Sequence, residues 1–359
     1  MASGNDWVYM QRCIQLARLG AGNVAPNPMV GAVLVHENKI IGEGYHQQYG
    51  QAHAEVNCIR NAEEYADRIS LLASSTLYVS LEPCAHFGKT PPCADLVISK
   101  RIPKVVIGCR DPFKQVDGKG IEKLENAGIE VVTGVMEEEC KSLNERFFTF
   151  HIKRRPFIIL KWAQTANGRI AGPDSSRILI SNEVTNRLVH RWRSEEASIL
   201  VGTTTALKDD PSLTTRLWSG KNPLRLIIDR NLQLPDSLRL FNGEAKTIIF
   251  NSVRQGENDN CRYYQLNNEQ SFTQQITNAL FQLNIQSVLV EGGSKLLQSF
   301  IDEDLWDEAR VITNNDLQIA EGTRAPDMPE TNLADTWNIY SDTIRTFKPS
   351  TLKAVRYSI

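Results

Sequence analysis

Two segments decide the fold of the first half of the chain: Gln51-Ala52-His53-Ala54-Glu55-Val56 and, after a short interval, Glu82-Pro83-Cys84-Ala85-His86-Phe87-Gly88-Lys89-Thr90-Pro91-Pro92-Cys93. They contain a histidine and two cysteines, which are side chains that bind zinc, and a glutamate two residues after the histidine. The order matches the H-x-E and P-C-x-x-C arrangement of zinc-dependent deaminases, although the interval between the cysteines is longer here.

The residue types indicate an open, catalytic zinc site that binds one Zn²⁺ per chain. His53, Cys84 and Cys93 would supply an imidazole and two thiolates and leave the fourth tetrahedral position for water. Zinc lowers the pKa of a bound water far below the bulk value. Glu55 would accept the water proton and return protons to a ring nitrogen and to the departing ammonia. The pattern therefore predicts hydrolytic deamination with Glu55 as the catalytic residue.

Local periodicity predicts where these groups lie. Ala32–Val35 and Thr76–Ser80 are typical of strands, and the runs after His53 and after Cys93 are typical of helices. Both ligand groups are then near helix starts, where the helix dipole favours a thiolate over a thiol.

Two alternatives compete with the catalytic interpretation. In a closed structural site, His86 or Cys58 would be the fourth ligand, and Glu55 would have no role. In the other, His53-Ala54-Glu55 is a chance tripeptide on a solvated helix, but Pro83-Cys84 and Cys93 argue against it. The other cysteines lack such a pattern and are predicted to be buried, reduced thiols: Cys13, Cys58, Cys109, Cys140 and Cys261.

Length and charge restrict the class of protein. A chain of 359 residues predicts two domains, and a formal net charge of −2 gives no broad basic surface for nucleic acid. A small-molecule substrate is favoured. Residues 1–20 are typical of an amphipathic helix without a signal-peptide core, so we expect a cytoplasmic location. No apolar run approaches the roughly 20 residues that span a bilayer, so no membrane partner is expected.

A domain boundary is expected between Glu145 and Pro156, where an acidic helix gives way to Lys153-Arg154-Arg155. The domains are accordingly taken as residues 1–149 and 150–359. Phe157–Ala163 follows as a continuous apolar run, which is typical of a strand buried on both faces.

A strand, turn and helix are predicted near the end of the second half, at Ser287–Glu291, Gly292-Gly293 and Ser294–Phe300. Such a turn can hold a phosphate, because glycine lets backbone N–H groups approach the anion at a helix start. Taken alone the signal is weak, since most such turns only connect elements and the G-x-G-x-x-G fingerprint of dinucleotide-binding domains is missing.

The first half resembles the deaminase half of the bifunctional deaminase-reductases of bacterial riboflavin biosynthesis. The resemblance implies a cytidine-deaminase-like three-layer α/β/α domain that deaminates a phosphorylated pyrimidine, a diaminopyrimidinone with a ribosylamino 5′-phosphate. It also implies the substrate contacts Asn27, His86, Lys89 and Asp111. The matching segments are Pro26-Asn27-Pro28-Met29-Val30-Gly31, Gly42-Glu43-Gly44-Tyr45-His46, His53-Ala54-Glu55, the segment from Glu82 to Cys93, and Asp111-Pro112.

The second half resembles the dihydrofolate-reductase-like α/β domain that uses NADPH in the same family. The matching segments, in chain order, are Leu160-Lys161, Asn167-Gly168-Arg169-Ile170-Ala171, Arg193, Val201–Thr205, Asp209–Arg216, Ile227-Ile228-Asp229 and Glu291-Gly292-Gly293. The cofactor contacts expected from the resemblance are Ala163, Leu179, Thr205, Asp209, Arg230, Gly293, Ser294, Lys295, Leu296, Leu297, Gln298 and Ser299. The expected reductase-substrate contacts are Lys161, Arg177, Arg193, Leu213, Arg216 and Glu291. A homo-oligomer is implied as well.

Arg177 and Leu179 depart from the family pattern, and so does Arg230, which stands where a serine is common. Arg177 would replace a neutral phosphate contact with a charged one, and Leu179 would remove an aromatic wall beside the cofactor. Arg230 is predicted to reach the adenosine 2′-phosphate that distinguishes NADPH from NADH.

Arginine and lysine in the matching segments have competing interpretations. Arg193 and Arg216 would bind a ribose phosphate through bidentate donors, whereas an isolated arginine is more often an exposed ion-pair partner. Lys161 would either polarise a carbonyl or imine or line the cleft near a phosphate.

The resemblance as a whole implies two consecutive steps, deamination of the ring and then transfer of hydride from NADPH to C1′ of the ribosyl unit. Three rivals are a nucleic-acid deaminase, which needs stacking platforms and a basic groove, a protein with a single activity, and a binding module without turnover. Neither aromatic platforms nor a basic groove stand out, and the intact Glu55 argues against a merely structural first domain.

Overall fold

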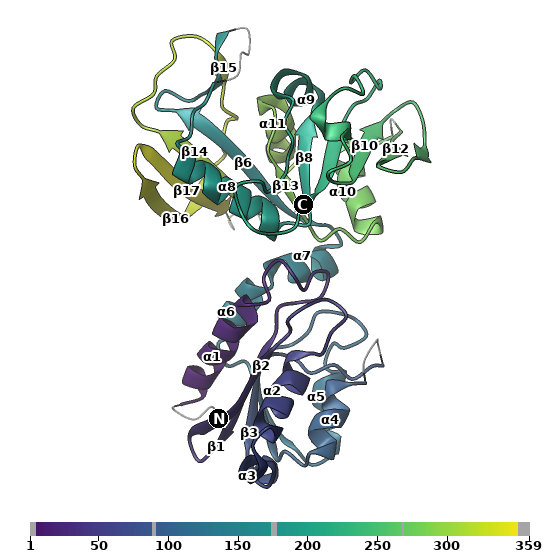
Figure 1. Ribbon diagram of the computed structural model, residues 1–359, viewed down its shortest axis with the longest axis vertical. Helices are drawn as coiled ribbons and strands as arrows, with labels where there is room; N and C mark the ends of the chain where they lie inside the picture. The colour runs from purple at the N-terminus through teal and green to yellow at the C-terminus, as the bar shows by residue number, and fades with distance from the viewer. Residues whose placement is uncertain (1–4, 88–90, 174–177, 268, 351–359) are drawn as a thin grey trace, which may run out of the picture. The chain divides into compact units, whose positions relative to one another are not determined.

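The computed structural model describes residues 5–87, 91–173, 178–267 and 269–350 (Figure 1). Two predicted contacts, Lys89 and Arg177, lie outside these ranges. The chain divides into two compact units, Met1–Arg154 and Arg155–Ile359, and each unit is described by itself.

The first unit is built on a five-stranded sheet in the order β2-β1-β3-β4-β5. β1 is antiparallel to β2 and β3, and β3, β4 and β5 are parallel. The strands are β1 (Gly31–His36), β2 (Lys39–Tyr45), β3 (Thr76–Leu81), β4 (Lys104–Cys109) and β5 (Glu130–Thr133). The helices are α1 (Asp6–Arg18), α2 (Ala54–Glu63), α3 (Ala66–Ile69), η1 (Leu72–Ser74), α4 (Cys93–Ser99), α5 (Lys119–Asn126), α6 (Glu137–Leu143) and α7 (Glu145–Lys153).

Alternation along the strands supplies two cores, one on each face of this sheet. In β1, Ala32 and Leu34 join the core beneath α2, α4 and α5, while Val33 and Val35 join the core beneath α1 and α6. Successive side chains of a strand point to opposite faces, so a strand with both faces covered is apolar throughout. The three-layer α/β/α prediction for the first half is confirmed.

The second unit contains a ten-stranded sheet in the order β11-β12-β10-β9-β8-β13-β6-β14-β17-β16 and a separate β7–β15 pair. The sheet strands from β12 to β14 are parallel, and β11, β17 and β16 add antiparallel edges. The strands are β6 (Phe157–Thr165), β7 (Arg169–Ala171), β8 (Ser198–Gly202), β9 (Leu224–Ile228), β10 (Thr247–Asn251), β11 (Gly256–Glu257), β12 (Cys261–Gln265), β13 (Ser287–Val290), β14 (Glu308–Asn314), β15 (Thr323–Arg324), β16 (Thr331–Ile339) and β17 (Asp342–Pro349). The helices are α8 (Glu183–Glu195), α9 (Thr203–Asp209), η3 (Arg239–Phe241), α10 (Phe272–Gln282) and α11 (Ser294–Asp302).

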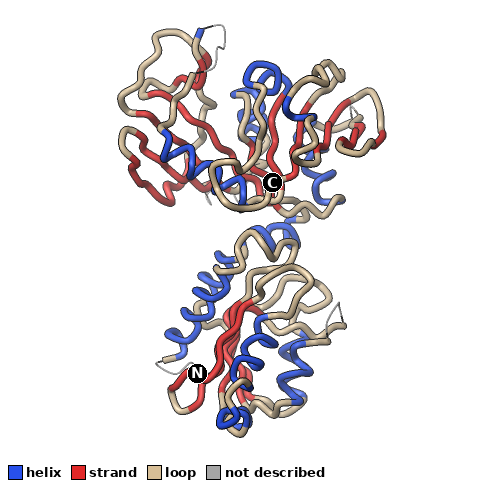
Figure 2. The backbone as a smooth tube through the Cα atoms, in the orientation of Figure 1, coloured by secondary structure: helices blue, strands red, loops and turns tan. Residues whose placement is uncertain are grey.

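Helices cover both faces of this sheet, and Figure 2 shows strands as the central layer of each unit. α10 and α11 pack on one face with Val288 and Val290, and α8 packs on the other face with Leu289. The carboxyl ends of the parallel strands therefore meet at one edge, where ligands bind in open α/β sheets. The α/β prediction for the second half is confirmed.

Several local predictions are also confirmed. Ala32–Val35, Thr76–Ser80 and Phe157–Ala163 lie in strands, and helices start at Ala54 and Cys93. One strand is shorter than predicted, because β13 ends at Val290 and Glu291 already belongs to the turn. The five cysteines predicted to be ordinary thiols are all buried and free. Within the described ranges, no helix is both long and apolar enough to cross a membrane.

Candidate functional site

Three predicted ligands of the first unit meet at one point. His53 precedes α2, Cys84 follows β3, and Cys93 is the first residue of α4. Their ligand atoms all lie within 4.8 Å of one another. Nδ1 of His53 faces both sulfurs, at 3.6 Å from Cys84 Sγ and 3.4 Å from Cys93 Sγ.

These separations fit zinc. With Zn–S near 2.3 Å and Zn–N near 2.0 Å, a tetrahedron has an S···N edge of about 3.5 Å. Among the described residues, only these three form such a group, so neither Cys58 nor His86 completes a four-ligand set. The closed structural alternative is therefore wrong for the described part of the chain, and His53 would bind through Nδ1.

The thiols are tuned for metal binding by each other and by the helix start. Contacts with the Cys93 thiol and with His53 lower the pKa of the Cys84 thiol to about 4. The contact between the two thiols, together with burial, raises the pKa of the Cys93 thiol. The Cys93 backbone N–H also donates to Cys84 Sγ, at 3.3 Å. Negative charge on sulfur is thus held at the positive end of α4.

Glu55 lies in the first turn of α2, two residues after His53, and is 3% exposed. Burial raises the pKa of Glu55, against the opposing effect of His53. A raised pKa brings the protonated and ionised forms of the carboxyl group closer in free energy at neutral pH. This suits a residue that both accepts and returns protons.

Asn27 is oriented by a residue that sequence reasoning did not select, His46. The His46 Nδ1 lies 3.0 Å from the Ala52 carbonyl, which makes it the donor, so His46 Nε2 accepts from Asn27 Nδ2 at 3.2 Å. The Asn144 side chain forms two hydrogen bonds with the Met29 backbone, of 2.8 and 2.9 Å. The family-like segment Gly44-Tyr45-His46 could have drawn attention to His46. Asn144 is 115 residues from Met29, so no local sequence pattern connects the two.

His86 and Asp111 follow β3 and β4, the neighbouring strands that end beside the ligand site. The Nδ1 atom of His86 is buried and has no hydrogen-bond partner among the described residues. Phe113 contacts the His86 ring, at a centroid distance of 6.0 Å, and its N–H donates to Asp111 Oδ1 at 2.8 Å. Burial raises the pKa of Asp111 to about 7.

The second unit brings three predicted substrate contacts together in a buried cluster. Arg193 on α8 donates to Glu291 through Nε and Nη2, at 2.7 and 2.8 Å, and Lys161 Nζ on β6 lies 3.5 Å from Glu291 Oε2. The three side chains are only 6 to 14% exposed. The exposed-partner interpretation is therefore wrong for Arg193, but Arg216 is exposed.

Electrostatics keeps this cluster charged although it is buried. Burial alone would raise the pKa of Glu291, but Arg193 and Lys161 outweigh it and lower the pKa to about 2. Burial lowers the pKa of Lys161, opposed by Glu291. With one carboxylate between two cationic side chains, the cluster favours an anionic or electron-rich ligand.

His190, which the sequence did not single out, lies one turn before Arg193 and is 4% exposed. Leu217 N–H points at His190 Nδ1, at 3.5 Å, and Arg193 Nη1 donates to the Thr214 carbonyl at 3.3 Å. Burial and the nearby Arg193 and Arg216 lower the pKa of His190 to about 4, so the ring is neutral at pH 7. The segment between Leu213 and Leu217 is therefore attached to α8.

The predicted turn between a strand and a helix is present, between β13 and α11. Gly293 precedes α11 with φ of 71°, a conformation that favours glycine. A Cβ built on Gly292 would lie 3.0 Å from the Thr205 side chain, and one on Gly202 would lie 3.8 Å from Leu296. Thr205, Gly293 and Leu296 are thus brought together at the carboxyl ends of β8 and β13.

The other predicted cofactor residues are more dispersed. Arg230 stacks on Phe272, with its guanidinium 4.2 Å from the ring centroid, and Leu179 is 78% exposed. Ala163 is partly buried beside the α8 core, and Asp209 ends α9. In α11, Lys295 is exposed, Ser294 and Ser299 hydrogen-bond to backbone carbonyls, and Gln298 bonds Asp302 and Asp327. Leu297 points into the core at 1% exposure, so a cofactor would meet its backbone.

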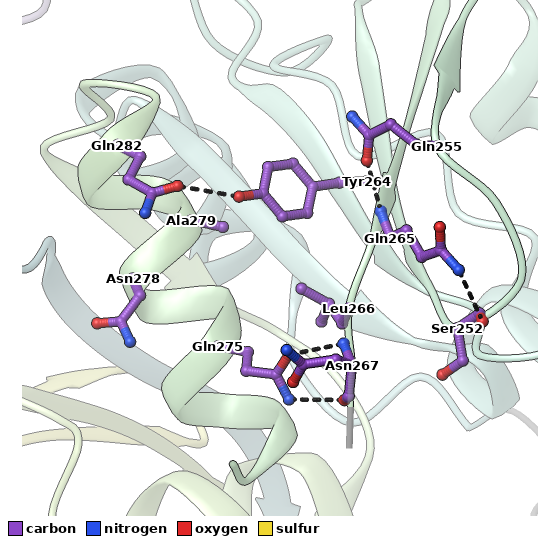
Figure 3. A pocket seen from close by; sticks show the side chains of 10 residues that line it. All are labelled: Ser252, Gln255, Tyr264, Gln265, Leu266, Asn267, Gln275, Asn278, Ala279 and Gln282. Carbon is purple, nitrogen blue, oxygen red and sulfur yellow. Dashed lines mark hydrogen bonds between the residues drawn. The ribbon is translucent and has the colours of Figure 1, made fainter. Parts of the chain in front are cut away.

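An open hollow of about 660 Å³ between β12 and α10 contains none of the predicted site residues (Figure 3). Its polar side chains largely form hydrogen bonds with other residues of the lining, mostly with their backbone groups. Tyr264 Oη donates to Gln282 at 3.1 Å, and the Gln275 amide forms bonds of 2.9 and 2.8 Å with the backbone of Asn267. The lining gives no indication of a ligand.

The two sites define a class of protein: a zinc-dependent deaminase of the cytidine-deaminase type joined to a reductase domain. Comparison with family models agrees. Residues 4–109 match the cytidine and deoxycytidylate deaminase zinc-binding region, and residues 156–314 match the RibD C-terminal domain.

Relatives match across both halves. The chain is 42% identical to the riboflavin biosynthesis protein RibD of Aquifex aeolicus, over 86% of each chain, and 39% identical to that of Bacillus amyloliquefaciens, over 84% of this chain and 82% of the relative. A Thermotoga maritima crystal structure, a diaminohydroxyphosphoribosylaminopyrimidine deaminase/5-amino-6-(5-phosphoribosylamino)uracil reductase, superposes with a TM-score of 0.87 at 37% identity, covering 96% of this chain and 99% of that one. Acinetobacter baumannii RibD gives 0.85 at 30% identity, covering 97% and 99%.

The chain belongs to the RibD family of riboflavin biosynthesis proteins. It is a bifunctional deaminase and reductase, with a zinc-binding deaminase domain and a reductase domain of the type that uses NADPH.

Proposed function

We propose that the first unit deaminates 2,5-diamino-6-ribosylamino-4(3H)-pyrimidinone 5′-phosphate and that the second reduces the product to 5-amino-6-ribitylaminouracil 5′-phosphate. The observation that carries this is the open group of His53, Cys84 and Cys93 beside the buried Glu55. The similarity to the Thermotoga maritima diaminohydroxyphosphoribosylaminopyrimidine deaminase supports the choice of substrate.

In the first step, bound zinc supplies a polarised water as the nucleophile. Glu55 accepts a proton from that water and delivers protons to the ring nitrogen and to the leaving amine, so that ammonia departs and a ring carbonyl remains. Its burial keeps bulk water from competing for these protons. We propose Asn27, His86, Lys89 and Asp111 as the residues that hold the pyrimidine and its phosphate.

In the second step, bound NADPH supplies the hydride that arrives at C1′. We propose that Lys161, Arg177, Arg193 and Glu291, with Leu213 and Arg216, hold the ribosyl phosphate. The Gly293–Ser299 turn and helix start, with Ala163, Leu179, Thr205, Asp209 and Arg230, would hold the cofactor. The convergence of Thr205, Gly293 and Leu296 supports this assignment.

The domain limits and the assembly belong to the same proposal. We assign deamination to residues 1–149 and reduction to residues 150–359, which the division into compact units at 154/155 supports. A homo-oligomer in the cytoplasm is the expected state of the enzyme. The expected partner is a small phosphorylated pyrimidine, since the net charge of −2 offers no broad basic surface for nucleic acid.

The test is turnover of the phosphorylated diaminopyrimidinone by wild type and by Glu55→Gln, with ammonia release and NADPH oxidation followed separately. Wild type should give both signals. Glu55→Gln should release no ammonia and should still oxidise NADPH when the deaminated intermediate is supplied. If the wild type gives neither signal, the proposal is overturned. Ammonia release without NADPH oxidation would confine the activity to the first unit.

A further inference from the structure

The Glu82 carboxylate is surrounded by backbone N–H groups. Oε2 accepts from the N–H groups of Asp111 at 3.2 Å and Gly118 at 3.0 Å, and Oε1 accepts from Gly120 at 2.9 Å and Ile121 at 3.4 Å. The residue is 4% exposed. A single side chain thus joins the end of β3 to both ends of the loop between β4 and α5.

No lysine, arginine or histidine in the described part of the chain forms an ion pair with Glu82. Its two oxygens instead accept backbone N–H groups of the loop and of the first turn of α5. The site is therefore built for a side chain with two acceptor oxygens, which a carboxylate offers and an amide does not.

The loop is pressed closely onto the segment that contains Glu82. A Cβ at Gly120 would lie 2.0 Å from the Pro83 carbonyl oxygen, so only glycine fits there. Gly118 has φ of 86°, a conformation that other residues rarely adopt. The sequence of the loop is thus adapted to contact with Glu82 and Pro83, directly before Cys84.

The attached loop contains candidate contacts for the pyrimidine. Glu82 holds the backbone N–H of Asp111, whose carboxylate is in turn fixed by Phe113 N–H at 2.8 Å. The Phe113 ring contacts the rings of His86, at 6.0 Å, and of His151, at 5.0 Å. Displacement of the loop would therefore move Asp111 and the support of His86 together, while Cys84 stays tied to α4 through the Ala94 N–H, which donates to the Cys84 carbonyl at 3.1 Å.

We propose that Glu82 is a positioning residue of the deaminase site, whose carboxylate fixes the loop from Asp111 to Ile121 relative to Cys84 so that Asp111 and His86 face the substrate. This inference rests on the proposed deamination. It assigns Glu82 no contact with substrate or metal, and it predicts an effect on substrate binding that is separable from metal retention.

The test replaces the carboxylate with an amide. Glu82→Gln keeps the size of the side chain, but one oxygen acceptor becomes an NH₂ group that opposes backbone N–H donors. The loss of about two hydrogen bonds should raise the KM for the pyrimidine substrate on the order of tenfold. We expect kcat per bound zinc to change by less than about threefold, because the reacting groups are unchanged. Zinc content and the reduction of supplied deaminated intermediate should equal those of wild type.

Glu130→Gln is the matched control, since Glu130 is a carboxylate of the same unit, 63% exposed and paired with Lys104. It should leave every reading unchanged. In the double variant with Asp111→Asn, the effect of Glu82→Gln on KM should be much smaller than in the wild-type background, because both act on the same contact.

An unchanged KM in zinc-replete Glu82→Gln would overturn the inference, and so would fully additive effects in the double variant. If Glu82→Gln loses zinc, the inference is tested with Gly118→Ala instead, because this substitution disturbs the loop without altering the end of β3. A raised KM with zinc retained supports the inference, and an unchanged KM overturns it. Failure of wild type to release ammonia would instead reject the proposed function, so the two failures are distinguishable.

Discussion

Arg193 and Glu291 form a two-point ion pair in the second unit, with Nε–Oε1 and Nη2–Oε2 distances of 2.7 and 2.8 Å. They are 98 residues apart in sequence, and Lys161 lies 3.5 Å from the same carboxylate. Both partners were predicted as separate substrate contacts. Their pairing shows that the carboxylate also sets the direction of the guanidinium, so the cluster acts as one preorganised group.

Arg193→Lys should reduce the kcat/KM of the reductase by about 10- to 100-fold, because lysine lacks the planar fork that matches the Glu291 carboxylate. Deamination by the same preparation should be unaffected. Arg191→Lys is the control, since Arg191 lies on the same helix, is 53% exposed and pairs with Glu195. A reductase that tolerates Arg193→Lys would contradict a role for the bidentate pair.

Lys161→Met separates the two roles that the sequence left open for this lysine. If the ammonium polarises the reacting carbonyl or imine, kcat should fall by about 100-fold with little change in KM. If it lines the phosphate cleft, KM should rise and kcat should persist. Steady-state reduction of the deaminated intermediate at saturating NADPH distinguishes these outcomes. No change in either constant would remove Lys161 from the site.

Cys84→Ala and Cys93→Ala should each lose most of the bound zinc, measured by elemental analysis of the purified chain, and with it the deaminase activity. Cys58→Ala should retain both, because Cys58 is buried but does not belong to the three-ligand group. Zinc retained in both ligand variants would reject the ligand set, and zinc lost from Cys58→Ala as well as from the two ligand variants would restore the closed-site alternative.

His190 should make the second unit sensitive to acid. Its pKa in the folded state is about 4, below the ordinary value of 6.5, so on acidification the unfolded chain takes up the proton first. The free energy of unfolding should therefore be highest above pH 6.5 and should decline as the pH falls toward 4. His190→Gln should flatten this decline in thermal unfolding followed by calorimetry. An equally steep decline in the variant would show that other groups cause it.

Arg230→Ala should raise the KM for NADPH about tenfold and spare that for NADH, since the guanidinium is expected to bind the 2′-phosphate. Arg254→Ala is a suitable control, because Arg254 also stacks on an aromatic ring, that of Tyr263 at 3.8 Å. An unchanged preference between the two cofactors would mean that the stack of Arg230 on Phe272 is structural only.

The sequence by itself determined the features that depend on short spacing. His53 and Glu55 are neighbours at one helix start, and Cys93 opens another, so their chemistry could be predicted from local pattern. The strand, turn and helix around Gly293 were predictable for the same reason, because hydrophobic periodicity and glycine report on local backbone structure.

Only the tertiary structure decided which distant groups meet. The packing of strands and helices decides that Nδ1 of His53 faces the metal site and that Glu82 anchors the loop after β4. It also makes His190 the neutral neighbour of Leu217. The pairing of Arg193 with Glu291 is of the same kind. Such contacts follow from the sum of many weak packing and hydrogen-bond terms across the unit, which no short window of sequence contains.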